Sequence, residues 1–143
     1  MPTSASQIRS ALQTALSAVT ELKGGVYIGR TAQFSGFPCA RLYLNAIQEE
    51  KENADTTQNY RVYVYRIDIV MTVAIPGQAK SASEGEFEDA VDAVMDKLNT
   101  EWELGGLLEG SSLEPSQVRY EESPQGLTVY LPLTFFAKTL VTI

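Results

Sequence analysis

The sequence feature that most constrains the fold is the stretch of residues 60–75, in which apolar side chains recur at every second position. Because successive side chains of a β-strand point to opposite faces, this pattern predicts one long strand with a continuous apolar face. At about 3.3 Å per residue the strand would span roughly 50 Å, well beyond the usual 17–20 Å. We expect it to bend, or its first half to project beyond the body as an arm. The predicted apolar face consists of Tyr63, Tyr65, Ile67, Ile69, Met71, Val73 and Ile75.

A first helix is predicted over residues 4–22, where apolar side chains recur at spacings of three and four. Ser4 and Gln7 have the spacing of a capping box, which would satisfy backbone N–H groups at the start of the helix. Gly24 and Gly25 should end it, since glycine readily takes the left-handed conformation that closes a helix.

A second helix is predicted from about Ser83, after the break at Pro76-Gly77 that ends the long strand. Ser83 and Glu86 form its expected capping box, and further acids in its first turns suit the positive end of the helix dipole. The predicted buried stripe consists of Phe87, Val91, Val94, Met95, Leu98 and Trp102.

Four shorter strands complete the predicted fold. They cover residues 26–29, 39–47, 117–121 and 127–136, and the last apolar run continues to residue 143. Residues 31–38, a polar hairpin loop at 48–58, an irregular connector at 107–115 and a turn at 122–126 separate the elements. Pro132 cannot donate a ladder hydrogen bond, which suggests an edge strand or a bulge.

The predicted order is α-β-β-β-α-β-β, which belongs to the α+β class. We expect a mostly antiparallel or mixed sheet with two helices packed on one face. A chain of 143 residues is large enough for a single domain, residues 1–143, with its own core.

Composition limits the classes of function. The net charge of −7 disfavours nonspecific binding to nucleic acid and to anionic membranes, and no apolar run approaches the length of a membrane span. The absence of histidine removes the usual general base and the commonest metal ligand. The single cysteine, Cys39, is interpreted as a small buried side chain. The first ten residues lack the pattern of a secretory signal, so a cytoplasmic origin is the default expectation.

No catalytic, cofactor-binding or metal-binding residue is predicted. Glu88, Asp92 and Asp96 share one helix face, but the acids of this region lack the spacing of a calcium loop and are interpreted as a solvated face. The glycine pairs at 24–25 and 105–106 match no phosphate-binding motif. Glu49, Glu50 and Glu52 fall in the predicted loop, where carboxylates rarely keep a raised pKa, and they are interpreted as a polar or partner-contact surface rather than as glycosidase acids.

The start of the long strand combines tyrosines with arginines. The group consists of Tyr60, Tyr63 and Tyr65 beside Arg61 and Arg66, and its composition resembles a platform for single-stranded nucleic acid. The acidic total and the core-facing positions of Tyr63 and Tyr65 favour packing in a core or an interface instead. Arg66 and Asp68 lie two residues apart on the mixed face of the strand. If that face is buried between subunits they would form interface ion pairs, and if it is exposed they would serve solubility.

Three segments carry a resemblance to a known family: Gly36-Phe37-Pro38-Cys39-Ala40 at a strand entry, the tyrosine-rich strand over 60–69 and the helix over 86–98. Together with the N-terminal helix and the acidic loop, their order resembles that of the tail terminator proteins of long-tailed bacteriophages, including the minor tail protein U type. The resemblance covers roughly residues 4–136 and consists of hydrophobic pattern and element order.

The resemblance implies a small α+β subunit that forms a ring, typically a hexamer, at the head-proximal end of the tail tube. Such a ring stops polymerisation of the tube protein and offers a surface to the head connector or neck protein. It implies a virion protein assembled in the host cytoplasm, without enzymatic activity, cofactor or membrane contact, through whose lumen DNA passes without specific binding.

Two other classes remain open: another neck or head-completion adaptor of the phage particle, and a small ligand-binding or enzymatic α+β domain. Pattern alone selects the candidate residues for contact with other subunits or partners. They are Glu49, Glu50, Glu52, Tyr60, Arg61, Tyr63, Arg66 and Asp68.

Overall fold

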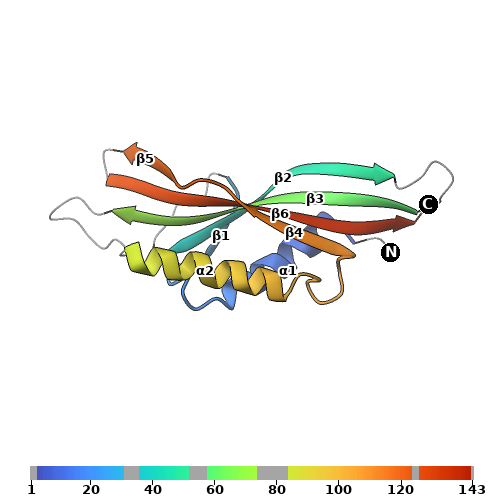
Figure 1. The fold of residues 1–143 in the computed structure, drawn as a ribbon, viewed down its shortest axis with the longest axis horizontal. Helices are drawn as coiled ribbons and strands as arrows, with labels where there is room; N and C mark the ends of the chain where they lie inside the picture. Colours follow the sequence, from blue (N-terminus) through green and yellow to red (C-terminus); the bar gives the residue numbers. More distant parts are fainter. Residues whose placement is uncertain (1–2, 31–35, 52–57, 74–83, 124–125, 143) are drawn as a thin grey trace.

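The fold was analysed in a computed structural model of the chain, which describes residues 3–30, 36–51, 58–73, 84–123 and 126–142 (Figure 1). Within these residues, two helices and six strands follow one another. Their bounds are α1 (Ala5–Ser17), β1 (Val26–Ile28), β2 (Cys39–Lys51), β3 (Gln58–Val73), α2 (Glu84–Thr100), β4 (Gly110–Pro115), β5 (Arg119–Ser123) and β6 (Gly126–Thr142).

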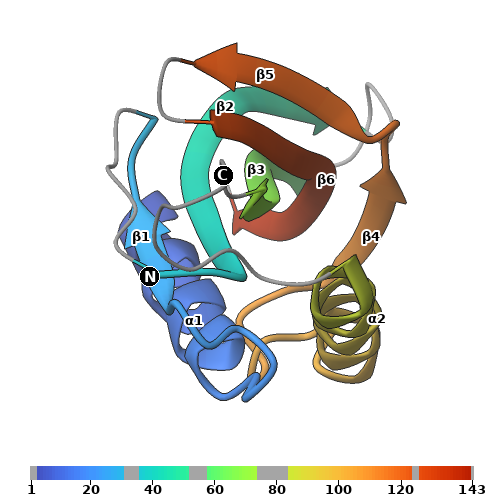
Figure 2. The ribbon, with the colours of Figure 1, turned by 90° about the vertical axis from the view of Figure 1, so that its left-hand side faces the viewer.

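The strands form one mixed sheet in the order β1-β2-β3-β6-β4, and β5 also pairs with β6. Only the short β1 runs parallel to its neighbour β2, and the other pairs described are antiparallel. Both helices lie on one side of the strongly coiled sheet (Figures 1 and 2). The predicted α+β class, with a mixed sheet and two helices on one face, is confirmed.

The central strand β3 pairs along its whole length with β6 and along most of it with β2. Its predicted apolar face is confirmed from Tyr63 to Met71, because every second side chain in this range belongs to the core cluster. We call this side of the sheet the helix face. The opposite side, which carries Arg41, Arg66 and Asp68, is called the open face because neither α1 nor α2 covers it (Figure 2). Residues 74–77, with the predicted end of the strand, lie outside the described residues.

The helix face and the two helices enclose the core. The capping box of Ser4 and Gln7 is confirmed, because each side chain bonds the backbone N–H of the other residue. The capping box at Ser83 lies outside the described part of the chain. The fully buried helical side chains include Ile8, Leu12 and Leu16 of α1 and Ala90, Val94 and Leu98 of α2.

The first helix ends at Ser17, five residues before its predicted end. Beyond it the backbone turns more tightly, since the N–H of Val19 bonds the carbonyl of Leu16 and the N–H of Leu22 bonds that of Val19. Val19 and Leu22 are nevertheless buried. The apolar spacing therefore predicted their burial correctly but not the helix that was expected to contain them.

The prediction of Trp102 as part of the buried stripe of the second helix is wrong. The helix ends at Thr100, and the indole is 43% exposed. The chain changes direction after Thr100, so the spacing of three and four no longer places later side chains toward the sheet. Leu104 and Leu108, from this segment, enter the core instead.

The predicted hairpin loop at residues 48–58 is wrong in its first part. Strand β2 continues to Lys51, and its residues 48–51 pair with residues 59–62 of β3. Cross-strand ion pairs stabilise this polar pairing in place of a buried apolar face, which explains why the pattern of apolar residues missed it. Figure 1 shows that this end of the sheet extends beyond the helices. We call it the arm, defined as residues 48–51, 58–62 and 138–142.

The predicted irregular connector at residues 107–115 contains a further strand, β4, which pairs with β6. The sequence of β4 contains a single large apolar residue, Leu113. Neither apolar alternation nor β-propensity therefore predicts this strand. Strand β4 forms because its backbone can hydrogen-bond to the adjacent backbone of β6. This tertiary contact adds one strand to the predicted order of elements.

Strand β6 is central rather than an edge, which contradicts one of the two expectations for Pro132. Strand β4 pairs with residues 133–138 of β6 and β5 with residues 126–130, so Pro132 lies at the gap between the two partners. The carbonyl of Pro132 accepts from the N–H of Ser116 on this side. Because the nitrogen and carbonyl of one strand residue point the same way, the missing donor faces the gap and costs no ladder bond.

Candidate interaction surface

The arm brings together most of the candidate residues predicted near the start of the long strand. Arg61 donates to the Glu49 carboxylate through Nη2 at 2.9 Å and Nε at 3.3 Å. On the open face, Lys138 Nζ lies 3.4 Å from a Glu50 oxygen and 4.2 Å from the centre of the Tyr60 ring. These groups therefore pair within the chain.

Tyr63 does not fit its predicted role as a contact residue. Its side chain is 4% exposed and belongs to the core, and only its hydroxyl reaches Arg61, with Nη1 donating to it at 3.5 Å. Hydrogen bonds with Tyr63 and with Glu49 raise the pKa of the Arg61 guanidinium, which therefore stays charged. Glu52 lies outside the described residues.

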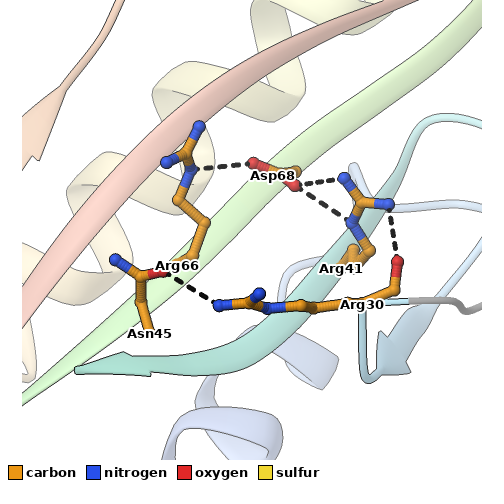
Figure 3. Close-up of polar contacts among 5 residues, drawn as sticks. All are labelled: Arg30, Arg41, Asn45, Arg66 and Asp68. Carbon is orange, nitrogen blue, oxygen red and sulfur yellow. Dashed lines mark hydrogen bonds and ion pairs between the residues drawn. The ribbon is translucent and has the colours of Figure 1, made fainter.

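A second polar cluster lies further along β3, around the buried carboxylate of Asp68 (Figure 3). Arg41 donates to Asp68 Oδ2 from Nη2 at 2.6 Å and from Nε at 3.0 Å, while Arg66 donates to Oδ1 from Nε at 3.3 Å. Asp68 is 1% exposed, so its charge depends on these two guanidinium groups rather than on water.

Arg30 extends this group, which we call the arginine cluster: Arg30, Arg41 and Arg66 around Asp68. The backbone carbonyl of Arg30 accepts from Arg41 Nη1 at 3.1 Å, and its own Nη2 donates to Asn45 at 3.3 Å. The Arg30 guanidinium also lies 5.0 Å from the centre of the Tyr43 ring, within cation–π range. Three guanidinium groups around one carboxylate give the cluster an excess of two positive charges.

Local backbone features explain why these side chains meet. The register of the β2–β3 hairpin places Arg41 directly opposite Asp68 on the open face. A bulge between Leu44 and Ala46 leaves Asn45 out of the regular ladder, beside Arg30. Gly29 turns the chain at the end of β1 with a φ of 106°, a conformation that glycine adopts readily.

The interpretation of Arg66 and Asp68 offered two alternatives, an interface pair or an exposed pair, and the structure shows neither. Asp68 is buried by the strands of its own chain. The sequence does not predict the pairing of Asp68 with Arg41. This pairing depends on the register of the β2–β3 hairpin, and a predicted loop at residues 48–58 does not define that register.

A groove of about 480 Å³ lies on the open face at the base of the arm. Val62 and Phe136 form the apolar part of the groove. Glu50 and Lys138 also line it and form an ion pair with each other. Ser111, Ser112 and Glu114 of β4 line its other side. An apolar strip between polar rims is typical of a protein contact surface.

The described residues contain no group of three or more His, Cys, Asp or Glu side chains placed to hold a metal ion. Within the same residues, no helix is both long and apolar enough to cross a membrane.

Gly24 packs closely against Gly36 at the entry to β2. A Cβ added to Gly24 would lie 2.1 Å from the carbonyl oxygen of Gly36. This close contact fixes the entry to β2 beside the arginine cluster.

Two buried groups, Cys39 and Tyr65, have strongly raised pKa values. Burial raises the pKa of the Cys39 thiol from 9.0 to about 12, and burial likewise raises the pKa of the Tyr65 hydroxyl from 10.0 to about 12. Cys39 is fully buried, and Tyr65 donates to the backbone carbonyl of Ala5 at 2.6 Å at the start of α1. Both groups are neutral in the folded protein at ordinary pH.

These shifts predict a loss of stability in alkali. A group whose pKa is raised by folding stabilises the folded state fully below its unfolded pKa, and this contribution is lost as the pH rises through the folded pKa. The free energy of unfolding should therefore fall between about pH 9 and 12. Urea titrations across this range measure it, and the fall should be smaller in the Cys39→Ala/Tyr65→Phe variant. An equal fall in that variant would assign the alkaline loss to other groups.

No family model matches this sequence, and no curated protein matches it. Function is therefore inferred from the geometry of the described residues and from the resemblance in hydrophobic pattern and element order.

Proposed function

We propose that this chain is a structural subunit of a bacteriophage particle that assembles into a ring, a hexamer by the family resemblance, on the head-proximal end of the tail tube. The ring stops growth of the tube and provides the surface that joins the tail to the head connector or neck protein. DNA passes through its lumen without specific binding.

The observation that carries this proposal is the presence of exposed apolar side chains at two opposite borders of the sheet. Ile28, Leu44 and Ile47 are 39%, 38% and 52% exposed on β1 and β2. Val118 and Tyr120, at the start of β5 on the other border, are 42% and 68% exposed. Two different apolar patches on opposite sides of one subunit suit head-to-tail contacts, which generate a ring when the rotation closes.

The family resemblance supports the same role. The strand entry at Gly36, the tyrosine-rich β3 and the acidic α2 occur in the order seen in tail terminator proteins, and the arm provides a further exposed surface beyond the helices (Figure 1). A ring subunit meets two neighbours as well as the tube and the connector. It therefore needs several separate contact surfaces rather than one deep pocket.

The test measures assembly of the purified protein by sedimentation velocity and negative-stain microscopy, alone and with tail-tube subunits. The wild-type chain should form rings and stop tube growth. Ile47→Ser and Tyr120→Ser should each shift it toward monomers, because each removes the apolar side chain of one border.

Trp102→Ser is the matched control, since Trp102 is similarly exposed but lies after the end of α2 rather than on β1, β2 or β5. It should assemble like the wild type. A protein that remains monomeric, alone and on the tube, and leaves tube growth unchanged would contradict the proposal. Rings that bind only the connector, and do not cap the tube, would favour the neck adaptor instead.

A further inference from the structure

The arginine cluster contains three guanidinium groups, and Asp68 is the one carboxylate that pairs with it among the residues that the structure describes. Arg66 uses only Nε on Asp68, and its two terminal amino groups have no acceptor among the residues that the structure describes. Its side chain is 22% exposed, so these donors reach the surface of the open face. Arg30 is exposed, and within the described part of the chain its side chain donates one hydrogen bond, to Asn45. The cluster can therefore accept further negative charge from outside the chain.

The helix α2 carries the opposite imbalance. Glu88, Asp92 and Asp96 are exposed and follow one another at spacings of four, so they line one side of the helix over about 12 Å. None of them forms an ion pair with another residue of the described chain, whereas Glu86 pairs with Lys23 and Glu101 with Lys97. We call Glu88, Asp92 and Asp96 the acidic stripe.

The two charged surfaces lie on opposite sides of the subunit. Helix α2 covers the helix face of the sheet, while Arg41, Arg66 and Asp68 point to the open face (Figures 2 and 3). The stripe of one copy therefore cannot reach the cluster of the same copy. Complementary patches on opposite faces favour a head-to-tail contact between copies, in which every subunit uses both patches.

We propose that the arginine cluster binds the acidic stripe of α2 from the neighbouring copy. This inference rests on the ring proposed above and assigns its polar contact. Arg66 and Arg30 supply the donors, and Asp68 holds Arg66 and Arg41 in place from below. The contact gives the ring its direction, since the cluster of one subunit meets only the stripe of the next.

Phosphate groups of a nucleic acid are the other ligand chemistry that arginines commonly bind. The net charge of −7 and the Glu50 and Glu114 carboxylates on the rims of the neighbouring groove oppose approach of a polyanion to this face. A second copy brings only a local stripe of carboxylates, and its charge is complementary at that point.

The test is a charge exchange between the two surfaces. Arg30→Glu and Asp92→Lys each place like charges together, and each should raise the protein concentration needed for half-maximal assembly by about tenfold or more. Both residues are exposed, and neither touches Asp68 in the structure, so folding should be retained. The double variant Arg30→Glu/Asp92→Lys should recover assembly, because the exchanged charges attract again.

Glu103→Lys is the matched control, since it makes the same change in charge at an exposed position after the end of α2. It should leave assembly unchanged. Raising the salt concentration should weaken assembly of the wild type more than that of either single variant. Circular dichroism of each variant should match that of the wild type, which checks that the variants are folded.

The outcomes separate this inference from the proposed function. Wild-type rings with unchanged assembly of Arg30→Glu and Asp92→Lys would overturn the assigned contact and leave the ring proposal standing. Failure of the double variant to recover would also overturn it. Binding of a short DNA duplex that is lost in Arg30→Glu, without an effect on assembly, would reassign the cluster to phosphate. A wild-type chain that never assembles would overturn both proposals.

Discussion

Asp68→Ala is expected to lower the free energy of unfolding by about 3–5 kcal/mol, the usual cost of removing one partner of a buried ion pair. The substitution leaves the guanidinium groups of Arg41 and Arg66 close together without the carboxylate that both contact. The side chains of these arginines are 23% and 22% exposed, so partial hydration places the effect toward the lower end of that range. Urea unfolding followed by circular dichroism measures it, because the only tryptophan is already exposed.

Asp92→Ala is the control for this prediction. It removes the same charge from an exposed helix surface, and its effect should stay within about 0.5 kcal/mol. The triple variant Asp68→Leu/Arg41→Met/Arg66→Met should regain much of the lost stability, since apolar residues often replace a buried ion network without loss. Equal stabilities of the Asp68→Ala and Asp92→Ala variants would show that the network contributes little.

Phe135→Ala should cost about 3–5 kcal/mol, as expected for truncation of a fully buried aromatic side chain. Phe135 is 1% exposed on the central strand β6 and pairs across the ladder with Tyr65 on the helix face. Its removal leaves a cavity between the sheet and the helices that neither layer can close without shifting. Urea unfolding at neutral pH gives the difference from the wild type.

The neighbouring residue provides the control. Phe136 points to the open face, is partly exposed and borders the groove, so Phe136→Ala should cost only about 1–2 kcal/mol. Both variants replace a phenylalanine by alanine, at neighbouring positions of the same strand. Similar losses in both would mean that the open face is as tightly packed as the core.

Period-two alternation predicted the main strand and its buried face because both depend on the same physical cause, burial of one side of a sheet. Tyr65, Ile67 and Ile69 are buried as expected. The cap at Ser4 was predictable for a similar reason, since it depends on two residues three apart in the chain. Features that depend on local sequence were therefore accessible.

Features created by contact between distant segments could not be predicted from the sequence. Strand β4 forms because its backbone pairs with that of β6. Residues 48–51 form a strand because Glu49 pairs with Arg61 and Glu50 pairs with Lys138. The arginine cluster depends on the register that joins Arg41 to Asp68. Within the candidate site, Arg66 and Asp68 were selected by their place on β3, whereas Arg30 and Arg41 required the fold.

The bulge in β2 has a consequence for aggregation along the edge of the sheet. Beyond the three residues paired with β1, the outer side of this strand carries no further strand in the described residues, and such an edge can template stacking of other chains. The bulge after Leu44 interrupts the flat ladder, and Glu49 and Glu50 place like charges along the rest of it. The bulge and these carboxylates therefore oppose strand-to-strand aggregation along this edge.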